Sequence, residues 1–234
     1  MSEPSKPLVM GAGPRLPMPQ LRDLSAAFAL LTPILAAPPI NSDAFARATL
    51  FFPVVGVAVG AVLICLQHGL AAVLPTWLVA PLLVVAWCVF TFPTSAPRQA
   101  DTGSVWAIAA LWVVKLVAVA ALAHGLDAAL LFAPLLGRWS IVVLAIGARA
   151  ADHPGRKFNP SIAFREFGWT SAFTGAVLAG YGDAVGILIF IAAAAFILGI
   201  RLLQHRFFGG VTWVSLCLSL HLVETLLLIA LSAL

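Results

Sequence analysis

Three ionisable residues lie within long apolar stretches of the sequence. Lys115, Arg138 and Glu224 each lie inside a mainly apolar run. A charge deep in a bilayer is costly unless it faces a cavity or a partner, so each is a candidate site residue. Two interpretations stay open. Glu224 forms a structural ion pair with Lys115 or Arg138, or these residues contact a substrate.

His221 precedes Glu224 by three residues, which places both side chains on one face of a helix. Such helical pairs contribute metal ligands in some bundles. Two ligands alone do not define a metal site, and simple packing explains the pair better. The identity of any metal ligands is therefore left unknown.

A basic segment from residue 147 to residue 166 contains Arg149, Arg156 and Lys157. Arginine binds phosphate oxygens through its planar fork, and lysine binds them as a point charge. The segment is a candidate clamp for a phosphate or pyrophosphate. Alternatively, it is a loop that fixes orientation against anionic lipid.

Two glycines, Gly209 and Gly210, are followed by Thr212 at the start of the last apolar run. Paired glycines allow a close backbone approach, and the N-terminus of the next helix could face an anion. A tight turn between helices is the alternative. The sequence contains no GxSxG, Walker or HExxH motif.

The amino-acid composition indicates the kind of fold that positions these residues. The chain is 62% hydrophobic and 9% charged, whereas a soluble domain carries about a quarter charged residues. We therefore predict an all-α, polytopic membrane helix bundle in one domain, 24–234, after a polar tail, 1–23. A Pro-rich element at 24–40 precedes about seven transmembrane helices, at 50–68, 77–92, 103–123, 128–148, 169–181, 184–200 and 211–233.

The basic residues indicate the orientation. With these seven spans, all of the 13 Lys and Arg residues except Lys115 and Arg138 fall on one side of the membrane. The positive-inside rule makes that side cytoplasmic. The net charge of +4 then reflects orientation and attraction to the lipid bilayer, and no nucleic-acid partner is expected.

Four segments together resemble the cobalamin synthase family, adenosylcobinamide-GDP ribazoletransferase. They are FPVVG at 52–56 followed by Gly60, GSVW at 103–106 followed by Lys115, LGRW at 136–139, and RFFGGVT at 206–212 followed by Glu224. They occur in the family's order and cover the chain from about residue 31 to its end. The resemblance implies a bacterial inner-membrane enzyme of cobalamin biosynthesis.

The resemblance implies an activity and a site. Family members join adenosylcobinamide-GDP to α-ribazole or its phosphate, release GMP and use magnesium. Glu224 and Asp101 become the catalytic candidates. The expected partners are the corrinoid substrate or other cobalamin-assembly proteins, and the substrate-binding candidates are Arg138, Arg149, Arg156, Lys157, Lys115, Gly209, Gly210 and Thr212.

The chain also departs from the family pattern. The family's acidic motif has no counterpart, since residues 90–101 form a short loop, and His221 replaces the first Glu of the final pair. Mg²⁺ prefers carboxylate oxygens, so its expected ligands are largely missing. Three functions remain open: an active transferase, an inactive family member that binds or assembles at the membrane, and a small transporter.

Overall fold

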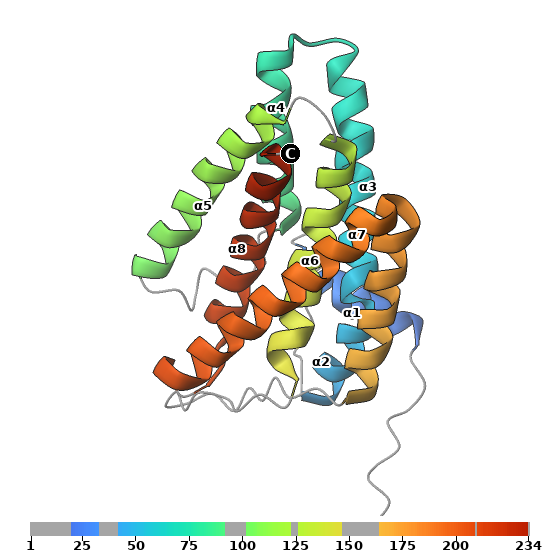
Figure 1. The fold of residues 1–234 in the computed structure, drawn as a ribbon, viewed down its shortest axis with the longest axis vertical. Helices are drawn as coiled ribbons and strands as arrows, with labels where there is room; N and C mark the ends of the chain where they lie inside the picture. The colour runs from blue at the N-terminus through green and yellow to red at the C-terminus, as the bar shows by residue number, and fades with distance from the viewer. Residues whose placement is uncertain are drawn as a thin grey trace, which may run out of the picture.

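The computed structural model describes residues 20–32, 42–91, 102–122, 126–146, 164–208 and 210–233, and these form helices without a strand (Figure 1). The prediction of an all-helical membrane bundle is confirmed. Its elements, in chain order, are α1 (Leu21–Leu31), α2 (Ser42–Ala48), the 3₁₀ turn η1 (Thr49–Phe51), α3 (Phe52–Ala71), α4 (Thr76–Thr91), α5 (Thr102–Ala121), α6 (Leu126–Ala145), α7 (Phe164–Phe208) and α8 (Trp213–Ser232).

Four helical segments are long and apolar enough to cross a bilayer: Ala44–Ala71, Leu126–Ala145, Phe164–Phe207 and Trp213–Ser232. Two shorter apolar helices accompany them, Thr76–Thr91 and Val105–Ala121. Each of the seven predicted spans corresponds to helix within the described ranges. The Pro-rich element begins as the 11-residue helix α1, and its residues 33–40 lie outside the described part.

The fifth and sixth predicted spans, 169–181 and 184–200, are the two arms of α7. The helix is broken at Asp183, whose φ of 49° and ψ of −134° are not helical. The arms meet at this turn in Figure 1. Positive φ is uncommon for a residue with a side chain, so the turn is a local strain that packing must offset. The predicted boundary at residues 182–183 is confirmed.

The helix α6 is the centre of the bundle. All of its residues from Ala129 to Ala145 are buried, and it packs against α3, α7 and α8. A helix that is hydrophobic on every side belongs in a core, where neighbouring helices replace lipid around it. Any polar side chain on α6 is therefore held inside the protein.

Two glycines of α3 bring that helix into backbone contact with α6. A Cβ added to Gly56 would lie 2.7 Å from Leu135 Cα, and one added to Gly60 would lie 2.8 Å from the Leu130 carbonyl oxygen. This is the GxxxG arrangement, in which small residues let two membrane helices pack closely. It fixes the position of α6.

The C-terminal end of α6 is held by a side chain of α7. Arg201 Nη1 donates to the Val143 carbonyl oxygen at 2.9 Å, and Nη2 donates to that of Ile146. The last carbonyls of a helix have no partner within the helix, and a cation there also suits the helix dipole. Arg201 therefore anchors α6 immediately before residues 147–163.

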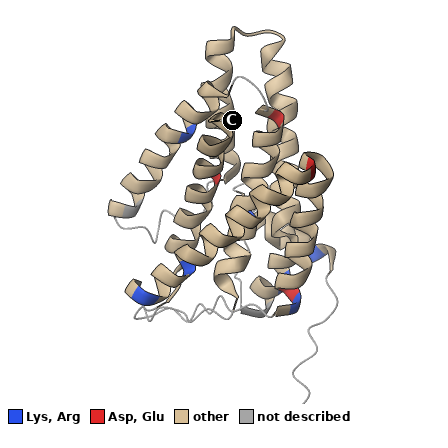
Figure 2. Ribbon diagram, viewed as in Figure 1, with Lys and Arg blue, Asp and Glu red and all other residues tan. Residues whose placement is uncertain are grey.

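Charged residues are distributed unevenly along the bundle. In Figure 2, the coloured Lys and Arg residues gather toward the end where α7 and α8 begin, apart from those within α5 and α6. Asp127 lies at the opposite end of α6, where it forms an exposed pair with His68 at 3.2 Å. The alternation of basic and neutral loops stays a prediction, because most of its basic residues lie outside the described ranges.

Candidate functional site

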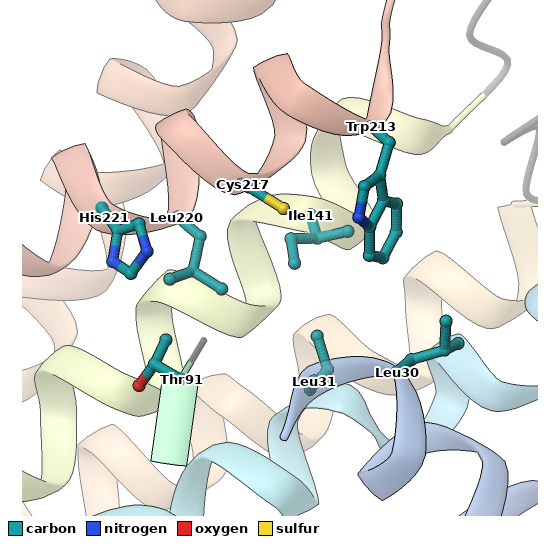
Figure 3. A pocket seen from close by; sticks show the side chains of 8 residues that line it. All are labelled: Leu30, Leu31, Thr91, Ile141, Trp213, Cys217, Leu220 and His221. Carbon is teal, nitrogen blue, oxygen red and sulfur yellow. The ribbon is translucent and has the colours of Figure 1, made fainter. Parts of the chain in front are cut away.

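A narrow crevice of about 10 Å³, with room for about one water molecule, lies between α1, α4, α6 and α8 (Figure 3). Most of its wall is apolar, and Thr91 and His221 supply polar groups at one end. Ile141, on α6, lies three residues after Arg138, so the crevice comes within one helical turn of that residue. Its lining residues are Leu30, Leu31, Thr91, Ile141, Trp213, Cys217, Leu220 and His221.

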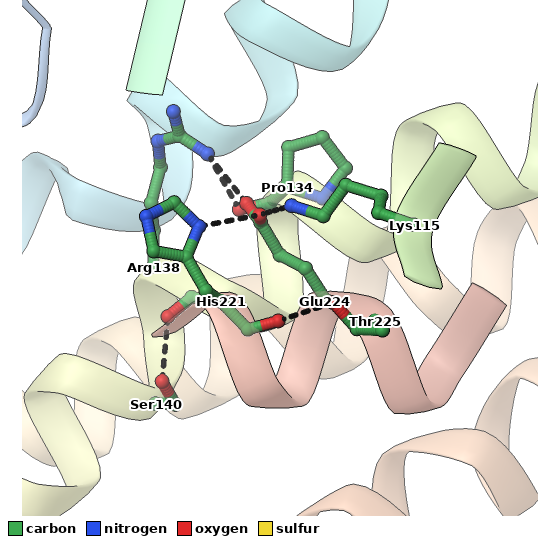
Figure 4. A network of polar contacts seen from close by, with 8 residues as sticks. Lys115, Pro134, Arg138, Ser140, His221, Glu224 and Thr225 are labelled. Atoms are coloured by element: carbon green, nitrogen blue, oxygen red, sulfur yellow. Dashed lines mark hydrogen bonds and ion pairs between the residues drawn. The ribbon is translucent and has the colours of Figure 1, made fainter. Parts of the chain in front are cut away.

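Beside this crevice, a charge cluster joins α5, α6 and α8. Lys115, Arg138 and Glu224 are all fully buried. Lys115 Nζ lies 2.5 Å from Glu224 Oε2, and Arg138 Nη1 lies 3.3 Å from Glu224 Oε1 (Figure 4). Glu224 thus forms both of the ion pairs that the sequence offered as alternatives, and a single carboxylate serves both cations.

A glycine makes room for the carboxylate. A Cβ added to Gly137 would lie 2.5 Å from Glu224 Cγ and 3.1 Å from its Oε1. Any larger residue at this position would push Glu224 away from Arg138. Gly137 belongs to the LGRW segment at 136–139, but no role could be assigned to it from the sequence alone.

Lys115 is further held by two tryptophans that the sequence analysis also missed. Its Nζ lies 4.5 Å from the centroid of the Trp87 ring and 4.1 Å from that of Trp112. These are cation–π distances, at which a ring face attracts an ammonium group. Trp112 lies one helical turn before Lys115, so its position on the same face was readable from the spacing.

His221 lies on the same helix face as Glu224, as predicted. Its Nδ1 is 3.7 Å from Glu224 Oε2, which is too long for a hydrogen bond, and its ring packs 5.0 Å from that of Trp112. His221 therefore connects the charge cluster to the crevice, because it contributes to both.

The cluster contains more cationic than anionic charge. Arg138 Nη1 donates to Glu224 and to the Pro134 carbonyl oxygen at 3.2 Å, but its Nε and Nη2 are buried without a hydrogen-bond partner. Two cations thus share one carboxylate. Chemically, such a site suits an anion with several acceptor oxygens.

The residues of this cluster do not fit a magnesium ion. Each oxygen of Glu224 already faces a cation, and Mg²⁺ requires carboxylates or similar hard oxygens free to approach it. Across the described ranges, no three His, Cys, Asp or Glu residues gather into a possible metal site. Asp101, the other predicted acid, lies outside those ranges.

The remaining predicted site residues are only partly described. Thr212 caps α8, since its Oγ1 accepts from the Ser215 backbone N–H at 3.1 Å and its own N–H donates to Ser215 Oγ at 3.0 Å. Gly210 precedes this cap. Their predicted role in substrate binding stays a prediction, as does that of the residues outside the described ranges, namely Arg149, Arg156, Lys157 and Gly209.

Comparison with known proteins gives matches along most of the chain. The model of a family described as cobalamin-5-phosphate synthase matches residues 23–92 and 98–232. A protein of Pseudomonas fluorescens (strain SBW25), adenosylcobinamide-GDP ribazoletransferase, is 29% identical over 217 residues, covering 80% of this chain and 88% of the relative. No solved structure matches the chain.

Proposed function

The chain belongs to the cobalamin-5-phosphate synthase family, and from that membership we propose that it joins adenosylcobinamide-GDP to α-ribazole or its phosphate. The name of the Pseudomonas relative describes such a transfer, and its similarity extends over most of both chains. The chain is a multi-pass membrane protein, so the reaction would take place within or beside a helix bundle.

The proposed reaction is a substitution at phosphorus. A hydroxyl oxygen of the ribazole forms a bond to the phosphorus next to the corrinoid, the bond from that phosphorus to GMP breaks, and the hydroxyl proton is released. Negative charge builds up on the leaving GMP phosphate. Fixed cations near the diphosphate stabilise that charge, and they cost no reorganisation when they are already in place.

One observation carries this proposal beyond the family match: the partly unpaired guanidinium of Arg138. It is fully buried, in a cluster with two cations and one acid, and its Nε and Nη2 have no acceptor. A diphosphate oxygen is the kind of acceptor that such a fork binds. Lys115 and Glu224 position the guanidinium through their shared ion pairs.

Magnesium remains a proposal based on family resemblance. The cluster around Glu224 does not fit the ion, so no step is derived through it. Asp101 stays the catalytic and metal-binding candidate outside the described ranges, together with the basic segment that contains Arg156 and Lys157. When bound, the ion would supply charge neutralisation at the diphosphate.

The orientation is a further part of the proposal. The basic loops would face the cytoplasm of a bacterial cell, with the protein in the inner membrane. The gathering of Lys and Arg toward one end of the bundle supports this orientation (Figure 2).

Activity of the purified protein tests the proposal. In detergent with magnesium, it should convert adenosylcobinamide-GDP and α-ribazole into adenosylcobalamin and GMP, measured by liquid chromatography. Arg138→Gln should lower kcat/KM at least 100-fold, because it removes a charge that the reaction needs. Arg22→Gln, which changes an exposed arginine of α1, should leave activity unchanged. Absence of product from folded wild-type protein would refute catalysis.

A second candidate is a binding or assembly protein that has lost catalysis. One observation favours it: both carboxylate oxygens of Glu224 form ion pairs with cations. The family has a pair of acidic residues in this part of the chain. This candidate predicts binding of adenosylcobinamide-GDP without product. Equilibrium binding measured on the same preparation as the activity assay separates the two candidates.

A further inference from the structure

The charge cluster is closed off in this structure. Lys115, Arg138 and Glu224 are fully buried, and the crevice beside them, of about 10 Å³, holds about one water molecule. A ligand as large as a diphosphate therefore reaches these residues only after part of the surrounding wall has moved. Enzymes commonly separate a buried site from water with such a movable element.

Three of the four helices around the crevice are tied to the cluster. Arg138 of α6 and Glu224 of α8 form an ion pair, and α4 places the Trp87 ring 4.5 Å from Lys115 Nζ. Moving any of these helices would break contacts that hold buried charges, which is costly. The fourth wall is α1, and it carries no residue of the cluster.

The helix α1 is short and lightly packed. It has 11 residues, and those that are buried are Asp23, Ala27, Ala29, Leu30 and Leu31. Its two buried leucines lie across the crevice from Cys217 (Figure 3). Alanine side chains bury little apolar area, and elements with few buried apolar contacts open locally at a low free energy.

An ion pair holds the first turn of α1. Asp23 Oδ1 accepts from Arg47 Nε of α2 at 3.1 Å, and the two side chains are only 5% and 17% exposed. Both ions recover water when the two helices separate, and a buried pair gains little over its hydrated ions. Separation of the helices therefore breaks the pair at low cost. Removing one partner, by contrast, leaves the other ion unpaired in the closed arrangement.

We propose that α1 is a lid, which separates from α2 at the Asp23–Arg47 pair and uncovers the side of α6 and α8 that faces the crevice. That side includes Ile141 and His221, each about one helical turn from a charged residue of the cluster. The opening itself stands on the packing of α1. Its role in admitting the nucleotide-activated substrate rests on the proposed function.

The native Cys217 thiol reports the opening, because it is buried and lines the crevice across from α1. With Cys65 and Cys88 replaced by serine, labelling by N-ethylmaleimide in detergent, followed by mass spectrometry, should be slow. Asp23→Asn should accelerate it at least fivefold, since Arg47 loses its partner in the closed arrangement and the open population rises.

Three comparisons separate opening of the lid from general loosening. Arg47→Gln should accelerate labelling as Asp23→Asn does, and the double variant should add little, because both changes break one contact. Asp127→Asn, which breaks the exposed pair with His68, should have no effect. In a background without other cysteines, Ile197→Cys, at a buried position of α7, should stay slow to react when Asp23→Asn is added.

Two results would overturn the lid: Cys217 labelling unchanged by the substitutions at the ion pair, or Ile197→Cys accelerated as much as Cys217. Where Asp23→Asn does not fold, Arg47→Gln alone decides between these outcomes.

A reversible cross-link tests the role of the lid in catalysis. Asp23→Cys and Arg47→Cys, in a background without other cysteines, are joined by a short bis-methanethiosulfonate. The cross-link should lower turnover at least tenfold, and a reductant should restore it. Full turnover by the cross-linked protein would remove the role of the lid and keep the transferase. Accelerated Cys217 labelling without product from wild-type protein would keep the lid and remove the transferase.

Discussion

At the scale of single residues, Glu224 organises the interior of this protein. It is the counter-ion for two cations on two other helices, and all three side chains are fully buried. Breaking a buried ion pair by removing one partner is strongly destabilising, because the remaining charge has lost both water and its counter-ion. Glu224 therefore affects stability directly, whatever its part in catalysis.

We expect Glu224→Gln to lower the free energy of unfolding by about 3–5 kcal/mol, because it leaves Lys115 and Arg138 buried with no carboxylate. Unfolding in detergent, followed by size-exclusion chromatography after heating, measures the effect.

The matched control adds Lys115→Met to Glu224→Gln. This double variant restores the net charge of the cluster, so it should be more stable than Glu224→Gln alone. A Glu224→Gln protein as stable as the wild type would contradict the counter-ion role.

The sequence was sufficient to identify these charged residues but not their surroundings. Because a charge in lipid is energetically costly, the three ionisable residues Lys115, Arg138 and Glu224 can be recognised as candidate site residues from the apolar sequence around them. Gly137 and Trp87 cannot be recognised in this way, because small and aromatic residues are common in membrane helices. Their roles depend on which helices meet, and that information is long-range.

At the scale of elements, α6 is fixed by its neighbours along its whole length. The glycines of α3 set its closest contact, and Arg201 of α7 binds its last carbonyls. The residues after α6 include the basic segment predicted to bind phosphate. The end of α6 from which that segment continues thus depends on a contact made by another helix.

Arg201→Gln should destabilise the fold by about 1–3 kcal/mol, since it removes charge-assisted bonds to the Val143 and Ile146 carbonyls. Arg201→Lys, which keeps the charge and can still make one such bond, should lose less. The midpoint of thermal unfolding in detergent measures both changes. Arg206→Gln, at an exposed position on the same helix, is the control, and an equal loss there would contradict the anchoring role.

Element boundaries were predictable where composition changes sharply. The seven apolar stretches all correspond to helix, and the break at residues 182–183 follows from the polar pair Gly182 and Asp183 between two apolar runs. The packing of the two arms of α7 against the other helices was not predictable. The arms are held by contacts with other helices, and a hydropathy pattern contains no information about those.

At the scale of the whole molecule, the described helices have one end where Lys and Arg gather and an opposite end that is nearly free of them (Figure 2). By the positive-inside rule, such an asymmetry predicts which end of a membrane protein faces the cytoplasm. The composition alone was enough to predict a membrane protein. The arrangement of its helices and their pairing needed the structure.

Cysteine labelling tests the orientation. After the native Cys65, Cys88 and Cys217 are replaced by serine, a membrane-impermeant maleimide should label Ala72→Cys in intact cells. It should label Arg156→Cys only after lysis, because that segment would face the cytoplasm. Labelling of Arg156→Cys in intact cells would reverse the proposed orientation.

The shared carboxylate has a consequence for biosynthesis. Arg138 and Glu224 are 86 residues apart, so a ribosome working at about 5–20 residues per second needs roughly 4–17 s to translate from one to the other. Throughout that interval, two cations sit in or near lipid at a cost of about 2.5–3.5 kcal/mol each. The final helix then brings in the one carboxylate that both cations share. A nascent chain that stops before α8 keeps both cations in the bilayer without their shared counter-ion.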